Sequence, residues 1–343
     1  MMRRALALAE KGLATATPNP RVGCVVTRGE AILGEGWHER AGGPHAEVVA
    51  LQGVSAEGAT VYLNLEPCNH QGRTPPCVDL LLKSKVKRVV AAMLDPNPQA
   101  SQGGKRLAAA GIRFEHGLLE AEARELNVGF VSRVTRGRPW VRLKVAATLD
   151  GRTALPDGRS QWITGPEARR DGHRWRSRAC AILTGIGTVK ADDPQLTVRE
   201  VPTPRQPLRV IVDSRLETPP SSRILQGEPV LVFAAREGRL PNAEVVALPN
   251  AGGKVELPKM LEALARRGIN ELHVEAGFRL NGSLVREGCV DEFLVYLNPS
   301  FLGDSAQGML DLPPVASLEK KLRVKLLSLE RLGEDLRLIA RPA

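Results

Sequence analysis

Residues 42–51 read GGPHAEVVAL and residues 65–77 read LEPCNHQGRTPPC, and these two stretches decide the fold predicted for the first half of the chain. They supply His45, Cys68 and Cys77, which match in type and number the protein ligands of a catalytic zinc whose fourth position stays open. His45 opens one helical pattern, and Cys77 opens another after two prolines, which are tolerated at a helix start. Because a helix N-terminus favours a thiolate, the pattern predicts a zinc site at the beginnings of two helices.

Glu47 stands two residues after His45, which is a rotation of roughly 200° on a helix of 3.6 residues per turn. We therefore do not expect it to bind the same ion from the same direction. Its expected role is that of a general base that activates water and then a general acid toward a leaving amine. Zinc lowers the pKa of a bound water toward about 7, and His-x-Glu followed by Pro-Cys is the signature of zinc deaminases.

A closed structural zinc site is the alternative interpretation. His70, together with the three ligands above, would complete a Cys₂His₂ set, but such a site leaves Glu47 without a role. The other cysteines lie in apolar runs and are expected to be small buried side chains: Cys24, Cys180 and Cys289. An odd number of widely spaced cysteines favours a reducing, cytoplasmic setting over a disulfide framework.

The length and charge of the chain narrow the class of protein. A chain of 343 residues exceeds the usual size of one domain, and none of its apolar runs approaches the roughly 20 residues of a membrane-spanning helix. The formal net charge of +10 favours an anionic partner, either nucleic acid or a phosphorylated small molecule. Aromatic residues make up only 3% of the chain, which is few for a surface that stacks single-stranded bases.

Alternation of short apolar runs with helical patterns predicts an α/β fold in both halves. The segment TRGRP at residues 135–139 separates them, so we expect one domain at 1–138 and another at 139–343. The second half has no complete Gly-x-Gly-x-x-Gly motif, because TGIGT at 184–188 has only the first pair of glycines. In VEAGFRLNGSLV at 274–285 a strand runs into a helix through Gly277, and the backbone N–H groups at that helix start could cradle a pyrophosphate.

The first half resembles the deaminase domain of the bifunctional riboflavin-biosynthesis deaminase/reductase family through TPNPRVGCVV, GEGWHERAGGPHAEVVAL and LEPCNHQGRTPPCVDLLL. Eight residues separate Cys68 from Cys77, whereas base deaminases acting on nucleic acid usually have two. The resemblance implies a cytidine-deaminase-like three-layer α/β/α fold and a contact between Asn19 and the pyrimidine. Arg73 and Thr74 could hold a phosphorylated pyrimidine. The implied reaction is hydrolytic deamination of 2,5-diamino-6-(5-phosphoribosylamino)pyrimidin-4(3H)-one.

The second half resembles the reductase domain of the same family through KVAATLDGRTA, SQWITGPEARRDGHRWR, AILTGIGTVKADDPQLTVR, VIVDS and VEAG. This implies a dihydrofolate-reductase-like α/β fold that uses NADPH to reduce the ribosyl group of 5-amino-6-(5-phosphoribosylamino)uracil to ribityl. The implied NADPH contacts are Ala146, Trp162, Thr188, Asp192, Gly277, Phe278, Arg279, Leu280, Asn281, Gly282 and Ser283. The implied substrate contacts are Ser160, Arg176, Leu196, Arg199 and Glu275.

Chemistry assigns roles to some of these residues. Arg176 and Arg199 are natural bidentate partners for a phosphate, and Lys144 with Asp192 could polarise or protonate the sugar oxygen during hydride transfer. The resemblance also implies a homo-oligomer acting on a small phosphorylated pyrimidine, with no nucleic-acid or membrane partner. The chain departs from the family in a short N-terminal segment and a short stretch at 201–207. The alternatives are a nucleic-acid base deaminase and a nucleic-acid-binding module with a closed zinc site.

Overall fold

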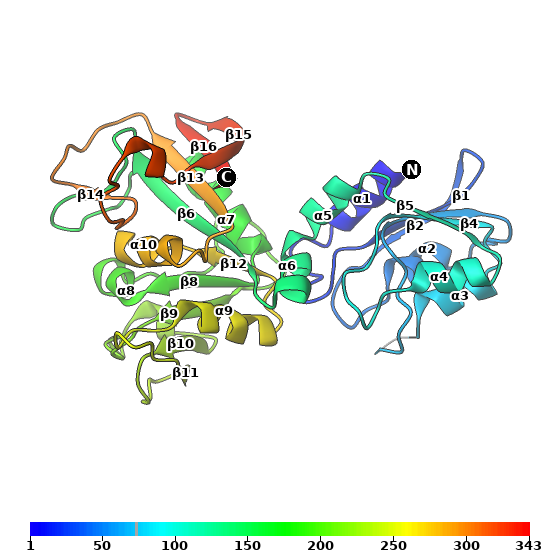
Figure 1. The fold of residues 1–343 in the computed structure, drawn as a ribbon, viewed down its shortest axis with the longest axis horizontal. Helices are drawn as coiled ribbons and strands as arrows, with labels where there is room; N and C mark the ends of the chain where they lie inside the picture. Colours follow the sequence, from blue (N-terminus) through cyan, green and yellow to red (C-terminus); the bar gives the residue numbers. More distant parts are fainter. Residues whose placement is uncertain (73–74) are drawn as a thin grey trace. The chain divides into compact units, whose positions relative to one another are not determined.

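A computed structural model describes residues 1–72 and 75–343, so the expected roles of Arg73 and Thr74 lie outside the described residues. The chain forms two compact units, Met1–Arg138 and Pro139–Ala343, each with its own sheet and core (Figure 1). No described helix has the length and apolar character needed to cross a bilayer.

The first unit is built on a five-stranded mixed sheet in the order β2-β1-β3-β4-β5. β1 is antiparallel to β2 and β3, and β3, β4 and β5 are parallel. The strands are β1 (Gly23–Arg28), β2 (Ala31–Trp37), β3 (Thr60–Leu65), β4 (Arg88–Met93) and β5 (Arg113–His116). The helices are α1 (Met2–Glu10), α2 (Ala46–Leu51), α3 (Cys77–Lys83), α4 (Gly103–Ala109), α5 (Glu120–Leu126) and α6 (Val128–Arg136).

Helices cover both faces of this sheet, because the central strands carry buried residues on both sides: five of the six residues of β1 and five of the six of β4 are buried. Ala50 of α2, Leu81 of α3 and Leu107 of α4 pack in one core with inward residues of β1, β3 and β4. Leu6 of α1 and Ala123 of α5 pack in a second core on the opposite face. The fold is therefore the three-layer, cytidine-deaminase-like arrangement that the sequence predicts.

The second unit contains a nine-stranded sheet in the order β11-β10-β9-β8-β12-β6-β13-β16-β15. It is parallel from β11 to β13 and ends in an antiparallel hairpin. These strands are β6 (Trp140–Thr148), β8 (Ala181–Gly185), β9 (Leu208–Val212), β10 (Val230–Ala234), β11 (Ala243–Ala247), β12 (Glu271–Val274), β13 (Glu292–Asn298), β15 (Val324–Leu332) and β16 (Asp335–Pro342). A small second sheet pairs β7 (Arg152–Ala154) with β14 (Gln307–Gly308).

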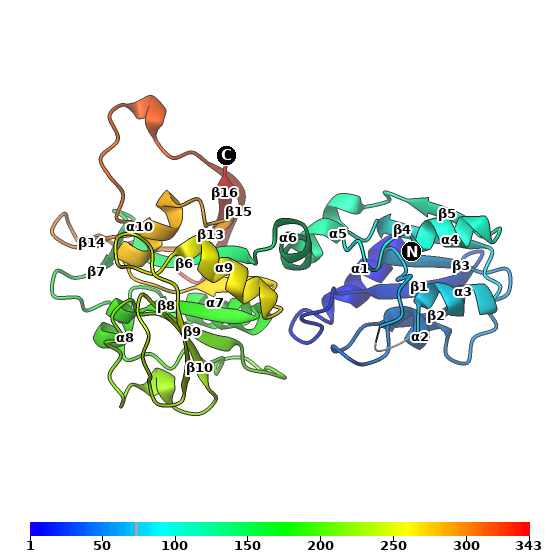
Figure 2. The same cartoon turned by 60° about the horizontal axis from the view of Figure 1, so that its bottom comes forward.

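Helices again cover the sheet on both faces. They are α7 (Pro166–Arg178), α8 (Ile186–Asp192), α9 (Leu257–Arg266) and α10 (Phe278–Arg286), with 3₁₀ turns at Arg223–Leu225 and Leu318–Lys320. Leu261 of α9 and Leu284 of α10 belong to one core, while Ala168 of α7 packs with Tyr296 and Leu294 of β13 on the other side. Since parallel strands end at a common edge, the loops after β6, β8, β9 and β12 gather there. Figure 2 shows the segment between β14 and β15 projecting from this unit.

Candidate active sites

The three predicted zinc ligands come together at the starts of α2 and α3. His45 directly precedes α2, Cys77 is the first residue of α3, and Cys68 lies in the loop after β3. His45 Nδ1 lies 3.2 Å from Cys77 Sγ and 3.6 Å from Cys68 Sγ. The ligand atoms of all three residues lie within 4.8 Å of one another.

These positions fit a tetrahedral zinc ion. Zinc bonds of about 2.3 Å to sulfur and about 2.0–2.1 Å to nitrogen put the ligand atoms of such a site roughly 3.5–3.8 Å apart. The hydrogen bond from the Cys77 thiol, followed by the bonds from His45 and the Cys77 backbone N–H, lowers the pKa of Cys68 to about 4 and prepares a thiolate ligand. Within the described part of the chain His70 does not join the cluster, so the geometry is that of an open three-ligand site.

Glu47 lies inside α2 beside the cluster, and only 3% of its surface is exposed. Burial is the main cause that raises the pKa of Glu47, and the nearby Cys68 raises it further. The carboxyl group reaches the Cys77 side chain, so it faces the metal-binding residues. A carboxyl with a raised pKa in this position can both accept and return a proton near neutral pH.

Asn19 is fixed next to the cluster by a histidine that sequence reasoning missed. Asn19 Nδ2 lies 3.0 Å from His38 Nε2, and His38 Nδ1 lies 2.9 Å from the Pro44 carbonyl oxygen. Since Asn19 Nδ2 can only donate and the carbonyl can only accept, His38 is protonated at Nδ1 and accepts at Nε2. The rings of His38 and His45 meet edge to face at 5.4 Å. His38 thus links Asn19 to the loop that carries the zinc ligand.

Glu66, the residue two before Cys68, anchors the second ligand loop. Its two carboxylate oxygens accept hydrogen bonds from the backbone N–H groups of Asp95 at 3.0 Å and Gly104 at 2.9 Å. Because 95% of Glu66 is buried, loss of these bonds would leave a charge unpaired. The loop before Cys68 is therefore tied to the end of β4 and the start of α4.

The second unit holds a cavity of about 1050 Å³ at the carboxyl edge of its parallel strands. All of the residues of the second unit that were predicted to bind NADPH or the ribosyl substrate line it, with the exception of Gly282. A Cβ on Gly282 would lie 2.2 Å from the Asp311 carbonyl oxygen, so this glycine allows close packing on the far side of α10. Leu196 has a positive φ of 51° and is buried in the core with Val189, with only 3% of its surface exposed.

Glu275 is the centre of an ion-pair network at one end of the cavity. Arg176 donates to both Glu275 oxygens, from Nε at 2.5 Å and from Nη2 at 2.9 Å, and donates from Nη1 to the Thr197 carbonyl oxygen at 3.0 Å. Lys144 Nζ lies 4.0 Å from Glu275 Oε2. Burial by itself would raise the pKa of Glu275. The charge and hydrogen bonds of Arg176, and then the smaller effects of His273 and Lys144, outweigh burial and hold this pKa well below its usual range. Arg176 therefore lines the cavity while it pairs with Glu275.

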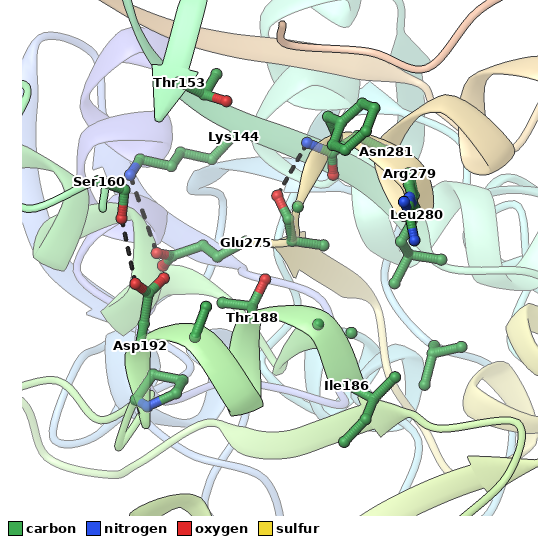
Figure 3. A pocket seen from close by; sticks show the side chains of 18 of the residues that line it. Lys144, Thr153, Ser160, Ile186, Thr188, Asp192, Glu275, Arg279, Leu280 and Asn281 are labelled. Atoms are coloured by element: carbon green, nitrogen blue, oxygen red, sulfur yellow. Dashed lines mark hydrogen bonds and ion pairs between the residues drawn. The ribbon is translucent and has the colours of Figure 1, made fainter. Parts of the chain in front are cut away.

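Lys144 and Asp192 face this end of the cavity together with Ser160 (Figure 3). Burial lowers the pKa of Lys144, although Glu275 opposes this shift. Burial raises the pKa of Asp192, whose Oδ1 accepts a hydrogen bond from Ser160 Oγ at 3.2 Å. An amine that loses its proton more readily and a carboxyl that keeps its proton more readily can exchange protons with a bound substrate.

Arg199 and Trp162 lie at the rim of the same end. Arg199 is exposed, and in residues 1–72 and 75–343 no hydrogen bond or ion pair engages its guanidinium. Trp162 is 64% exposed and has the Arg169 guanidinium 4.8 Å from its ring centroid. Arg199, in contrast to Arg176, is available to bind a phosphate.

Comparisons with known proteins agree with both sites. Residues 1–93 match the cytidine and deoxycytidylate deaminase zinc-binding region, and residues 139–338 match the RibD C-terminal domain. The chain is 45% identical to the riboflavin biosynthesis protein RibD of Escherichia coli (strain K12) over 353 residues, which cover 97% of this chain and 96% of that protein. The RibD of Aquifex aeolicus is 44% identical, with 98% and 96% covered. The chain belongs to the RibD family.

Solved structures support the same assignment over the full chain. The RibD of Acinetobacter baumannii superimposes with a TM-score of 0.93 at 41% identity and covers 100% of this chain and 98% of its own. The diaminohydroxyphosphoribosylaminopyrimidine deaminase/5-amino-6-(5-phosphoribosylamino)uracil reductase of Thermotoga maritima superimposes with a TM-score of 0.91 at 34% identity, with 100% and 97% covered. The chain is a bifunctional deaminase and pyrimidine reductase of riboflavin biosynthesis, with a zinc-binding deaminase domain and a dihydrofolate-reductase-like domain that uses a nucleotide cofactor.

Proposed function

We propose that residues 1–138 deaminate 2,5-diamino-6-(5-phosphoribosylamino)pyrimidin-4(3H)-one and that residues 139–343 then reduce 5-amino-6-(5-phosphoribosylamino)uracil with NADPH. The observation that carries this proposal is the pairing of an open His45–Cys68–Cys77 cluster beside buried Glu47 with a separate cavity that gathers Lys144 and Glu275. The first site suits hydrolysis of an amine, and the second suits reduction of a sugar phosphate.

In the deaminase site His45, Cys68 and Cys77 would hold one zinc ion. The ion would supply Lewis acidity and an acidified water in its open position. Glu47 would take a proton from water in the site and return it to the departing amine, and its buried carboxyl with a raised pKa supports this role. Asn19, oriented by His38, would donate its remaining amide hydrogen to the pyrimidine.

In the reductase site the start of α10, from Gly277 to Ser283, would hold the pyrophosphate of NADPH. Gly277, Phe278 and Arg279 line the cavity where α10 begins, and the backbone N–H groups at a helix start suit an anion. Ala146, Trp162, Thr188 and Asp192 would complete the cofactor contacts. The cofactor supplies a hydride.

Substrate contacts are proposed for the opposite side of the cavity. Arg199 and Ser160 would hold the ribosyl phosphate, while Glu275, kept ionised by Arg176, would accept hydrogen bonds from sugar hydroxyls. Lys144 would give a proton to the sugar oxygen released when C1' is reduced, because burial makes its proton easier to lose. Asp192 would support that transfer.

The proposed setting is cytoplasmic, with free thiols and a small phosphorylated pyrimidine as the partner rather than nucleic acid. All five cysteines are free in the structure, which suits a reducing compartment. We also propose a homo-oligomer that forms through the second unit. A run of exposed apolar side chains between β14 and β16 supports this: Leu312, Val315, Leu318, Leu322, Val324, Leu326, Leu327 and Leu329.

The test follows ammonia release and NADPH oxidation in one reaction with the diamino pyrimidine ribosyl phosphate, with and without a zinc chelator. We expect ammonia first, NADPH oxidation afterwards, and loss of both after chelation. Supplying the deaminated intermediate to the chelated enzyme should restore NADPH oxidation alone. If NADPH is not consumed even then, the second domain is reassigned to shaping the substrate site. If neither signal appears and the chain deaminates a base in RNA or DNA with steep salt dependence, the nucleic-acid alternative replaces the proposal.

A further inference from the structure

The cavity of the second unit extends well beyond the ionisable groups around Glu275. Figure 3 shows Lys144, Ser160, Asp192 and Glu275 on one side, and Ile186, Arg279 and Leu280 on the other. The lining continues past these residues to Ser214 and Arg215, and to the loop that contains Lys254. We infer that Arg215 and Lys254 bind the 2'-phosphate of NADPH and make this chain select NADPH over NADH; this inference rests on the proposed use of a nicotinamide cofactor.

The strand order places these residues where the adenosine end of the proposed cofactor would lie. Along the carboxyl edge β12, β8 and β9 are successive neighbours, and each step is about 4.8 Å. Glu275 follows β12, and Ser214 follows β9, so the two lie roughly 10 Å apart along that edge. A cofactor whose pyrophosphate sits at the start of α10, with its nicotinamide toward Lys144, therefore directs its adenosine toward β9.

Two loops join at this far end. The Ser214 hydroxyl oxygen accepts a hydrogen bond from the Val255 backbone N–H at 3.2 Å, which connects the loop after β9 to the loop after β11. Lys254 is adjacent to that bond, and Arg215 is adjacent to Ser214. Asn250 shapes the second loop by accepting from the backbone N–H groups of Gly252 at 2.9 Å and Lys254 at 3.0 Å. The backbone thus brings a lysine and an arginine to one rim of the cavity.

The carboxylates of the described residues do not fully neutralise the two cations at this rim, Arg215 and Lys254. Arg215 has one ion pair among the described residues, to Glu217 at 3.8 Å, and Glu217 is held more closely by Lys190 at 2.5 Å. No acidic side chain in residues 1–72 or 75–343 forms an ion pair with Lys254. A phosphate monoester carries up to two negative charges and three acceptor oxygens, so it would satisfy both cations. NADH has a hydroxyl at that position and would leave them unpaired.

The experiment measures binding without catalysis. Dissociation constants for NADPH and NADH are obtained from nicotinamide fluorescence for the zinc-loaded full chain and for R215Q, K254Q and the double variant. We expect each single change to weaken NADPH about tenfold, as for loss of one charge-assisted bond, and to change NADH less than about twofold. Adenosine 2',5'-bisphosphate should displace NADPH more strongly than 5'-AMP from the wild type, and this preference should vanish in the double variant.

R266Q is the matched control, because Arg266 is also an exposed arginine with one carboxylate at 3.8 Å, from Glu262, and it does not line the cavity. It should leave both constants unchanged. If the wild type binds NADPH but the double variant keeps the same NADPH-to-NADH ratio, the inference is overturned while the proposed function stands. If the wild type binds neither nucleotide, the proposed cofactor itself fails.

Discussion

Glu47 has only 3% of its surface exposed, stands two residues after the zinc ligand His45, and contacts a second ligand, Cys77. The change E47Q keeps the volume and the hydrogen-bonding capacity of the side chain but removes its ability to carry a proton. We expect ammonia release to fall by about 10² to 10⁴, while bound zinc and NADPH oxidation with supplied intermediate stay at wild-type levels. Zinc analysis and the two assays check this.

E39Q is the control for that substitution, because Glu39 is exposed in the loop before His45. It should behave as the wild type in all three measurements. An E47Q enzyme that releases ammonia at the wild-type rate would refute the role assigned to Glu47. A variant that loses zinc would show instead that Glu47 supports the metal ligands.

His173 predicts a pH dependence of stability in the second unit. Burial, followed by the charge of Arg176, lowers the pKa of His173 from 6.5 to about 4, and its Nδ1 accepts a hydrogen bond from the Arg199 backbone N–H at 3.2 Å. Because the unfolded chain binds a proton below pH 6.5 and the folded chain does not, stability falls as the pH drops from 6.5 to about 4. The loss is at most about 1.4 kcal/mol per pH unit.

Urea unfolding of the wild type and H173Q at several pH values isolates this contribution. The difference in the free energy of unfolding between the two proteins should change across the window from pH 6.5 to about 4, with H173Q the less sensitive. H116Q serves as the control, because His116 is exposed. Parallel pH profiles for H173Q and wild type would contradict the assignment.

At the residue scale the sequence predicted the zinc ligands because their residue types and spacing are typical of zinc deaminases. It did not predict His38, since a lone histidine seven residues before His45 has no diagnostic spacing and its contact with Asn19 depends on the path of two loops. It also did not predict that Arg176, expected to contact the substrate, pairs with Glu275. The bidentate pair with Glu275 joins residues 99 positions apart, and side-chain type alone does not tell whether an arginine faces a substrate or a buried carboxylate.

At the element scale, α2 holds His45 and Glu47 in place because β2 lets it approach closely. A Cβ on Gly36 would lie 2.6 Å from both the Ala46 carbonyl oxygen and the Ala50 backbone nitrogen. The change G36A therefore pushes the backbone of α2 away from the sheet. We expect a loss of roughly 1–3 kcal/mol in the free energy of unfolding of the first unit, and a loss of ammonia release larger than this destabilisation explains.

The control for G36A lies in the same strand. Ile32 is 46% exposed and is not among the described residues of the core into which α2 packs, so I32A should alter stability by no more than about 0.5 kcal/mol. Denaturant unfolding and ammonia release are measured for both variants under conditions in which each is fully folded. A G36A protein with wild-type stability and activity would show that α2 does not depend on this close approach.

The sequence predicted the central strands and the amphipathic helices well, because buried parallel strands are continuous apolar runs and α9 has a strong apolar face. It did not identify the hairpin of β15 and β16. β15 reads VKLLSLERL and is exposed along almost its whole length, so it has no alternation between an inward and an outward face. A bulge between Leu326 and Ser328 shifts its register with β16 and obscures the period further.

At the scale of the whole molecule, the two units have separate apolar cores and separate sites. Each contains titratable groups that its own fold brings together: Glu47 in one, and Lys144 with Glu275 in the other. The net charge of +10 is consistent with phosphate groups on both the substrate and the cofactor. A single change at either site should therefore abolish one reaction and leave the other measurable.

The exposed apolar side chains of β15 predict association between copies of this chain. Leu326 is 52% exposed and Leu329 is 55% exposed on the edge strand of the nine-stranded sheet. An unpaired apolar edge is a template for pairing with another chain, so a second copy would cover this surface. We expect the wild type to sediment as a dimer or a larger species. L326K/L329K should sediment as a monomer, because the new lysines of one copy would face those of the second copy and repel them.

I32K provides the matched control, since Ile32 is an exposed apolar residue on a strand of the other unit. Sedimentation and unfolding are measured for all three proteins, so that dissociation is separated from loss of the fold. If the wild type is monomeric, the predicted association is wrong. If L326K/L329K is folded and still associated, the interface lies elsewhere on the chain. A folded monomeric variant that retains ammonia release and NADPH oxidation would show that each chain contains both complete sites.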